Sequence, residues 1–368
     1  MRPWIFTLGT LLVLVPEILR VYFIMPFPGS QQDMPGGPDQ VETAYWLHNN
    51  IWWIRMVGLA LMTAPFVHYL RRGSKMKRIA VLLPLVVCAL VVYAFNFRFM
   101  ADKMFLVPKE KTLLSVAQAD ATSNELVLMV ERHGDARAYP VEVLGYHHQV
   151  LDTFGREPVL ITYCTVCRTG RAWSPVINGE VERFRLVGMD HFNAMFEDTR
   201  TKSWWRQVNG ECIAGPLKGT RMQEVPSAQM SFGEFARLHP AGQVLQPDRN
   251  FIEEYAELDG FDEGTVDSSL EQRDTASWRM KSWVLGVVHK GAARAYDWND
   301  LVALRTVVDT LAGDSIIIQL RPDDASFVVS RQADPDASVA TEAIPAYQEF
   351  WHSWLTFQPS TTRYQRVH

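Results

Sequence analysis

Three apolar segments in the first part of the chain constrain its fold more than any other feature. They run from residue 4 to about 25, from 51 to about 70 and from 79 to about 97. Each is close to the roughly 20 residues that a helix needs to cross the hydrocarbon core of a bilayer. We therefore expect a membrane section of three transmembrane helices over residues 1–100, followed by a separate water-exposed part.

The loops between these segments differ in charge, and the difference predicts an orientation. The loop after the first segment carries acidic residues and no lysine or arginine: Asp33, Asp39 and Glu42. The loop after the second segment is basic, with Arg71, Arg72, Lys75, Lys77 and Arg78. Because basic loops stay in the cytoplasm, we expect the amino terminus inside and everything after Phe97 outside the cytoplasmic membrane. The lipid bilayer is the first expected partner, and other membrane proteins are further candidates.

The first segment starts near the amino terminus, as a signal peptide would. It is longer than a typical signal-peptide apolar region and has no small-residue cleavage site, so we expect it to be retained as a helix. Glu17 and Arg20 lie within it, three residues apart, and can pair on one helix face. Charges at membrane depth are costly, so this pair either marks a functional site or fixes the packing of the helices.

The most distinctive stretch of the water-exposed part contains two cysteines. Val159 to Tyr163 is apolar and β-branched, which is typical of a buried strand. It runs directly into Cys164-x-x-Cys167, and the sequence after Gly170 predicts a return strand. Two thiols at the tip of a β-hairpin can point at one ion. This arrangement differs from the thioredoxin type, in which the Cys-x-x-Cys sequence opens a helix.

The water-exposed part also contains an internal repeat. Residues 126–139 can be laid on residues 283–296 without a gap, and a second match relates 226–240 to 345–359. Matches this long in one order indicate two related halves, the first half over roughly 110–250 and the second half over 275–368. Each half reads as a hairpin, a short helix, further strands and an aromatic helix. The fold class is therefore α+β, with a β-rich, internally duplicated extracytoplasmic domain after the three helices.

The two halves differ at the positions of greatest chemical interest. In this alignment Cys164 and Cys167 fall opposite Arg321 and Asp324, and His147 and His148 fall opposite Leu304 and Arg305. The fold can thus be built without the thiols and the histidine pair, so we expect the second half to lack the site and to keep only the framework.

Several stretches carry a resemblance to a known family. They are Arg20-Val-Tyr-Phe-Ile-Met-Pro-Phe-Pro-Gly-Ser30, Tyr146-His147, Val159-Leu-Ile-Thr-Tyr-Cys-Thr-Val-Cys167, Ser203-Trp-Trp205 and Gly215-Pro-Leu-Lys-Gly219. They resemble the DUF3179 domain family of uncharacterised, membrane-anchored bacterial proteins, over nearly the whole chain. The family usually has proline where Thr165 stands, and a Trp-His-Glu triplet where this chain has Tyr146-His147-His148, so that only His147 carries over. The resemblance implies this architecture in a bacterial cytoplasmic (inner) membrane and offers little mechanism.

The cysteine pair admits three functions. As metal ligands the two thiolates need further soft or borderline donors, for which His147 is the first candidate, with His148 and His191 as alternatives. Such a site suits copper or zinc, with a slight preference for copper, and would serve metal handling or electron transfer. The first alternative is a membrane-tethered thiol–disulfide oxidoreductase using the same cysteines. The second is a structural or assembly subunit of a membrane complex. No convincing general base is present, so whether the protein is an enzyme stays open.

The remaining features exclude other classes. A net charge of −5 without a long basic run in the water-exposed part argues against nucleic acid, and the sequence contains neither a phosphate loop nor a dinucleotide fingerprint. Cys88 lies in an apolar segment and is expected to be inert packing, and Cys212 is expected to be a buried free thiol.

Overall fold

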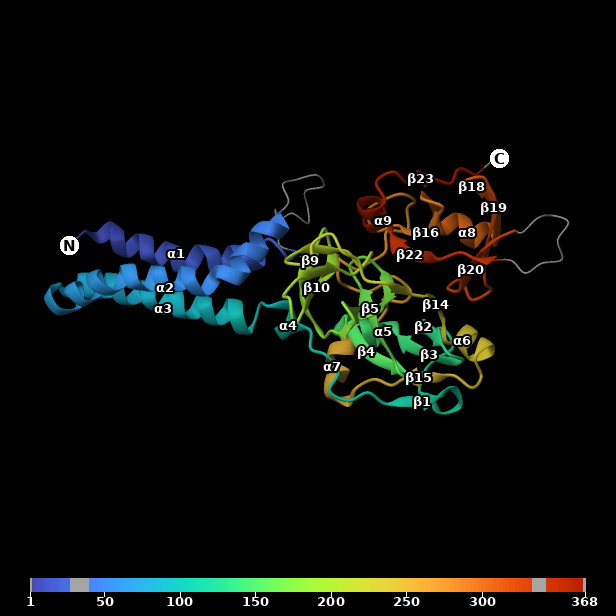
Figure 1. The fold of residues 1–368 in the computed structure, drawn as a ribbon, viewed down its shortest axis with the longest axis horizontal. Helices are drawn as coiled ribbons and strands as arrows, with labels where there is room; N and C mark the ends of the chain where they lie inside the picture. The colour runs from blue at the N-terminus through green and yellow to red at the C-terminus, as the bar shows by residue number, and fades with distance from the viewer. Residues whose placement is uncertain (1, 27–39, 333–341, 367–368) are drawn as a thin grey trace.

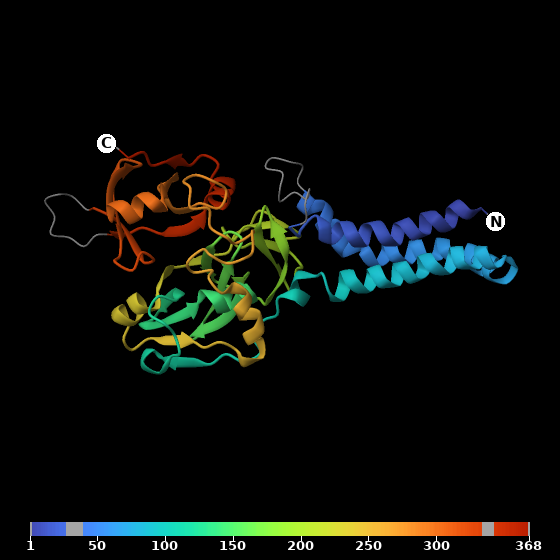
Figure 2. The ribbon, with the colours of Figure 1, turned by 180° about the vertical axis from the view of Figure 1, so that it is seen from behind.

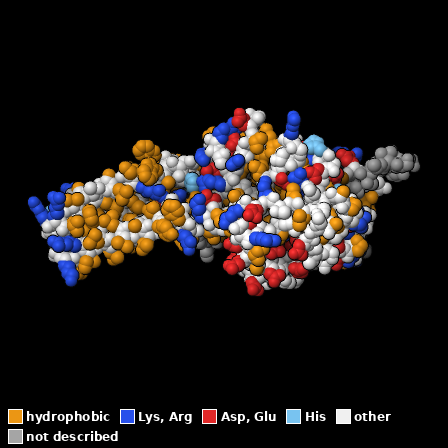
Figure 3. Space-filling view, turned by 90° about the horizontal axis from the view of Figure 1, so that it is seen from below, with side chains coloured by type: hydrophobic (Ala, Val, Ile, Leu, Met, Phe, Trp, Pro, Cys, Tyr) orange, Lys and Arg blue, Asp and Glu red, His pale blue; other side chains and the backbone are white. Residues whose placement is uncertain are grey.

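The computed structural model describes residues 2–26, 40–332 and 342–366. Three long helices lie side by side and form a rod that leads into a β-rich part (Figures 1 and 2). The helices are α1 (Pro3–Tyr22), α2 (Gln40–Arg72) and α3 (Lys75–Phe97). All three are long and apolar enough to cross a membrane. Apolar side chains cover the surface of the rod, with lysines and arginines gathered at its free end (Figure 3). The acidic residues Asp33 and Asp39 lie outside the described residues.

Helix α2 is longer than its apolar segment predicts, because it continues past the membrane-sized stretch to the β-rich part. The ring of Tyr45 in this extension packs edge-on against Trp204 at 5.1 Å between ring centroids. Glu42 pairs there with Lys218. The rod is thus joined to the β-rich part by side-chain contacts as well as by the chain that follows α3.

A buried polar cluster links the three helices. Glu17 pairs with Arg20 at 3.0 Å, as the sequence predicts, and also with Arg55 of α2. Asn96 of α3 completes the cluster, since its side-chain oxygen accepts from Arg20 at 2.7 Å and from Arg55 at 2.9 Å. The cluster joins two residues of α1 to one residue each of α2 and α3, and it thereby fixes the packing of the three helices.

The first half is built on two sheets, to which a third is added. One sheet has the order β1-β15-β3-β2-β14, with strands Leu113–Ser115, Gln243–Leu245, Asp135–Pro140, Leu126–Arg132 and Ser227–Ser231. The second has the order β13-β6-β5-β4, with strands Glu224–Val225, Thr169–Trp173, Glu157–Cys164 and Gln149–Phe154. The added sheet has the order β12-β11-β10-β9, with strands Cys212–Ala214, Trp204–Arg206, Asn193–Asp198 and Phe184–Asp190. A small hairpin of β7 (Val176–Ile177) and β8 (Glu180–Val181) precedes β9.

The second half has two four-stranded sheets. One has the order β22-β16-β17-β23, with strands Ala346–Phe350, Trp283–His289, Ala292–Asp297 and Thr362–Arg363. The other has the order β18-β19-β20-β21, with strands Thr306–Leu311, Asp314–Leu320, Phe327–Arg331 and Glu342–Ala343. Short helices complete the β-rich part: α4 (Ala101–Met104), α5 (Val141–His147), α6 (Phe232–Leu238), α7 (Ile252–Tyr255), α8 (Trp298–Leu304) and α9 (Trp351–Phe357).

Both halves connect these elements in the same order. A hairpin (β2–β3 or β16–β17) is followed by a helix and a meander of strands. A later strand, β14 or β22, pairs antiparallel with the first strand of the hairpin. Another, β15 or β23, pairs parallel with the second strand of the hairpin. The same polar contact recurs in each half. Tyr139 donates to Asp152 at 2.6 Å and Tyr296 donates to Asp309 at 2.9 Å, each beside an arginine paired with the same carboxylate. The mixed α+β, β-rich class expected from the sequence is confirmed.

Candidate functional site

The two cysteines lie at the tip of the hairpin formed by β5 and β6. Cys164 is the last residue of β5, and Cys167 lies in the turn before β6. The turn is closed by a hydrogen bond from the Arg168 amide to the Thr165 carbonyl at 3.0 Å. Both cysteines are fully buried free thiols. The pair therefore lies at the tip of a hairpin, as predicted.

The two sulfurs converge on one backbone oxygen. The thiols of Cys164 and Cys167 each donate to the carbonyl of Phe192, both at 3.3 Å. The side-chain amide of Asn193 donates to the sulfur of Cys167 at 3.6 Å. Since both thiols reach the same acceptor, the sulfurs are neighbours, and the added sheet supplies the groups that hold them.

Phe192 is brought to the thiols by a strained turn. His191 and Phe192 form the two-residue loop between β9 and β10, with φ of 49° and 66°. Two positive φ values are the signature of a type I′ turn, which favours Asn-Gly because most side chains resist this conformation. The carboxylate of Asp190 fixes the loop by accepting from His191 at 2.6 Å and Arg206 at 2.7 Å. Strain of this kind gathers at functional sites.

The second half contributes directly to the site, although it has no cysteine of its own. Lys281 donates to the carbonyl of Val166 at 2.9 Å, between the two cysteines. The imidazole nitrogen Nε2 of His352 lies 3.1 Å from the same carbonyl and 3.2 Å from the Lys281 nitrogen. The amide of Phe350 donates to the carbonyl of Cys167 at 2.9 Å. The site is therefore composite, made by both halves.

Electrostatics make the two thiols unequal. Burial raises the pKa of Cys164, but hydrogen bonds from the Cys167 thiol and from backbone amides, together with the charge of Lys281, outweigh it and hold the pKa below the usual value. Burial and the adjacent Cys164 raise the pKa of Cys167 well above its usual value. Cys164 is thus the more readily ionised of the two thiols.

The two basic groups beside the thiols are also shifted. Burial lowers the pKa of Lys281 to about 8, and the charge interaction with the nearby cysteines offsets part of this decrease. Burial and the charge of Lys281 lower the pKa of His352 to about 3. At neutral pH Lys281 carries the positive charge and His352 is neutral, so one cation faces the dithiol. Sequence reasoning missed both residues, because they lie far along the chain and belong to no local motif.

None of the predicted histidine ligands forms a three-ligand set with the two thiols among the described residues. His147 ends α5, and its two ring nitrogens contact the Leu106 carbonyl and the Tyr255 hydroxyl, the latter at 2.7 Å. His148 is buried, and its Nδ1 lies 3.1 Å from the carbonyl of Tyr146. His191 is closer to the site, on the strained turn. Among residues 2–26, 40–332 and 342–366, no group of three or more His, Cys, Asp or Glu side chains could hold a metal ion.

The other two cysteines are buried as expected. Cys212 donates to the carbonyl of Ala214 at 3.4 Å, and burial raises its pKa to about 11, so it is a poor nucleophile at neutral pH. Cys88 packs among apolar side chains of the three helices.

The turn that carries the thiols is anchored by a buried arginine. The guanidinium of Arg168 lies 3.7 Å from the ring centre of Trp283 and donates to the carbonyls of Phe261 at 2.8 Å and Asp262 at 2.9 Å. The carboxylate of Asp262 accepts in turn from the Leu126 amide at 2.8 Å. Residues 261–262, which lie between the two halves, thus contact both the turn and the first hairpin.

This anchor predicts a pH-dependent stability. Burial raises the pKa of Asp262 to about 6, above its value of about 3.9 in an unfolded chain. The folded protein therefore binds this proton more tightly, and its stability falls as pH rises through about 6. We expect Asp262→Asn to add about 1–3 kcal/mol to the free energy of unfolding at pH 8 and almost nothing at pH 4. Denaturant unfolding at both pH values measures this, and an equal effect at both would contradict it.

A family model described as "Protein of unknown function (DUF3179)" matches residues 109–361, more than two thirds of the chain. The chain belongs to the DUF3179 family. A search of curated proteins found no match, and a search of solved structures found none. The matched region of this DUF3179 protein begins after the three helices and includes Cys164, Cys167, Phe192, Lys281 and His352. The composite thiol site therefore lies wholly within the family domain.

Proposed function

We propose that this protein is a membrane-anchored thiol–disulfide oxidoreductase whose reacting groups are Cys164 and Cys167. The observation that carries the proposal is the pair of free thiols that share the Phe192 carbonyl at 3.3 Å. Two neighbouring sulfurs, one of which ionises more readily than the other, suit thiol–disulfide exchange. Hydrogen bonds, together with the charge of Lys281, favour the Cys164 thiolate, a role that a helix amino terminus has in other dithiol sites.

In this reaction Cys164 attacks and Cys167 resolves. The Cys164 thiolate attacks one sulfur of a substrate disulfide, forming a mixed disulfide and releasing the other substrate sulfur as a thiolate that takes a proton from water. Cys167 then loses its proton and attacks the Cys164 sulfur, so that the mixed bond breaks and the second substrate sulfur leaves. Two electrons pass from the dithiol to the substrate disulfide.

Binding of a soft metal ion is the second candidate function. It is favoured by the same convergence of two sulfurs, which suits copper(I), an ion that thiolates select. Among the described residues, no His, Cys, Asp or Glu side chain forms a three-ligand group with them. A two-sulfur copper(I) site for metal handling is therefore better supported than a zinc site with His147.

The proposal includes a location and an origin. The basic residues Arg71 and Arg72 end α2 at the free end of the rod, which supports a cytoplasmic position for that end and a site outside the bacterial inner membrane. Disulfide exchange suits that compartment. The shared order and pairing of strands in the two halves support an origin by duplication.

Redox titration of the purified full-length protein tests the function. We expect the wild type to form one reversible disulfide between Cys164 and Cys167, mapped by mass spectrometry, while Cys164→Ser forms none. Cys212→Ser is the matched control, because this thiol is equally buried, and it should behave as the wild type. Stoichiometric copper that is lost in Cys164→Ser, without a reversible disulfide, would favour the metal function. An inert pair without metal would favour a structural or assembly role and would overturn both.

A further inference from the structure

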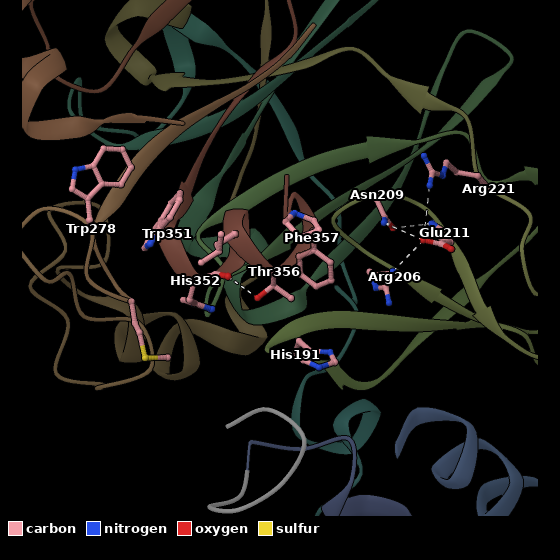
Figure 4. Close-up of a pocket in the computed structure, with 13 residues that line it drawn as sticks. His191, Arg206, Asn209, Glu211, Arg221, Trp278, Trp351, His352, Thr356 and Phe357 are labelled. Atoms are coloured by element: carbon pink, nitrogen blue, oxygen red, sulfur yellow. Dashed lines mark hydrogen bonds and ion pairs between the residues drawn. The ribbon is translucent and has the colours of Figure 1, made fainter. Parts of the chain in front are cut away.

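A cleft of about 740 Å³ opens beside the thiol site. Its walls come from α9 and residues 278–280 of the second half and from the turns at His191 and around β11–β12 of the first half (Figure 4). Ligand sites in proteins commonly have volumes of about 300–1,000 Å³. The cleft therefore has the size of a binding site, and both halves are needed to form it.

The cleft and the dithiol share their boundary. His352 lines the cleft, and its ring also contacts the carbonyl of Val166 between the cysteines. His191 lines it too, and the next residue, Phe192, receives both thiols. The rings of Phe192 and His352 meet edge-on at 5.6 Å between centroids. His352 thus lines the cleft and also contacts the ring of the residue whose carbonyl accepts from both thiols.

The two sides of the cleft differ in chemistry. The α9 side is apolar and partly open to water, with Leu355 41 % exposed and Met280 on the neighbouring segment 61 % exposed. The other side is polar: in Figure 4 Arg206, Asn209 and Arg221 surround Glu211, whose carboxylate contacts all three, and their remaining N–H groups offer hydrogen-bond donors. An extended peptide presents the matching groups, since its side chains alternate with carbonyl oxygens that accept hydrogen bonds.

We propose that this cleft binds an extended, cysteine-bearing segment of a partner protein and presents the sulfur of that segment to Cys164. This inference rests on the proposed oxidoreductase function and names its substrate class. The apolar side of the cleft receives a side chain next to the substrate cysteine, and the polar side receives the peptide carbonyls. Movement of the Phe192 and His352 rings opens the path to the thiols.

The test compares the rates at which the reduced protein releases thionitrobenzoate from two mixed disulfides. The probe is a ten-residue peptide with one cysteine beside a leucine, held in a mixed disulfide with thionitrobenzoate, whose release is followed by absorbance. The second probe is the same mixed disulfide on free cysteine. With the reduced full-length protein we expect the peptide to react at least tenfold faster than free cysteine.

The variant that tests the cleft is Met280→Asp with Leu355→Asp. Both side chains are exposed, so the fold should tolerate the changes. We expect the rate with the peptide to fall about tenfold or more and the rate with free cysteine to change less than twofold. Val308→Asp is the matched control, because Val308 is 61 % exposed on β18 and does not line the cleft; it should react as the wild type.

The outcomes separate the two proposals. If the wild type transfers electrons to neither probe, the oxidoreductase function itself fails. If it reacts with both probes but the cleft variant slows both equally or slows neither, the cleft is not the peptide site and this inference alone fails.

Discussion

Glu349→Leu is expected to destabilise the protein by about 3–5 kcal/mol. Glu349 is fully buried on β22 of the second half and pairs at 2.5 Å with Arg171 on β6 of the first half, which is also buried. Removing one partner of a buried pair leaves the other charge without compensation. Glu224 lies 3.9 Å from Arg171 but is exposed, so it cannot replace the lost carboxylate. Denaturant unfolding measures the loss.

A double variant separates the lost charge pair from lost packing. Arg171→Met with Glu349→Leu replaces the pair by apolar side chains of similar size, and should recover most of the stability, because such replacements are often neutral. Arg237→Ala is the control, since the guanidinium of Arg237 is exposed and its pair with Glu234 contributes little to stability. A loss below about 1 kcal/mol in Glu349→Leu would show that this contact does not hold the two halves together.

Gly286→Met should cost about 3 kcal/mol or more, at the upper end of overpacking penalties. Gly286 lies in the centre of β16, and the indole of Trp354 covers it so closely that a Cβ would sit 2.2 Å from the ring. Trp354 is buried on α9 and cannot move away cheaply. Thermal unfolding of the variant measures the effect.

The first half suggests the rescue for this change. Met129 is the residue aligned with Gly286, and Phe235 is aligned with Trp354; these two side chains belong to one apolar cluster. Gly286→Met combined with Trp354→Phe should therefore recover at least half of the lost stability. If the double variant is no more stable than Gly286→Met alone, the two halves do not share this packing, and the proposed duplication loses support.

Much of the fold was predictable, because its signals are local. Apolar segments of membrane length predicted α1 and α3 closely, whereas α2 begins earlier, since its polar extension is stabilised by contacts with Trp204 and Lys218 that no periodicity records. The Asn178-Gly179 turn is present with φ of 52° and 81° between β7 and β8, as turn chemistry predicts. The turn at His191 and Phe192 uses residues that disfavour it, so it had no such signal.

The candidate site likewise combines features that are local in the sequence with contacts between residues far apart in it. The sequence by itself determined that Cys164 and Cys167 lie together at a hairpin tip, because an apolar strand, a two-residue spacing and a following glycine are all local features. It also indicated that the second half lacks the thiols. Only the tertiary structure decided what surrounds them. Lys281 and His352 reach Val166 across 115 and 186 residues of sequence, and His147 turns instead to Tyr255, 108 residues away. Contacts over such separations depend on how sheets and halves pack, and they leave no pattern in neighbouring residues.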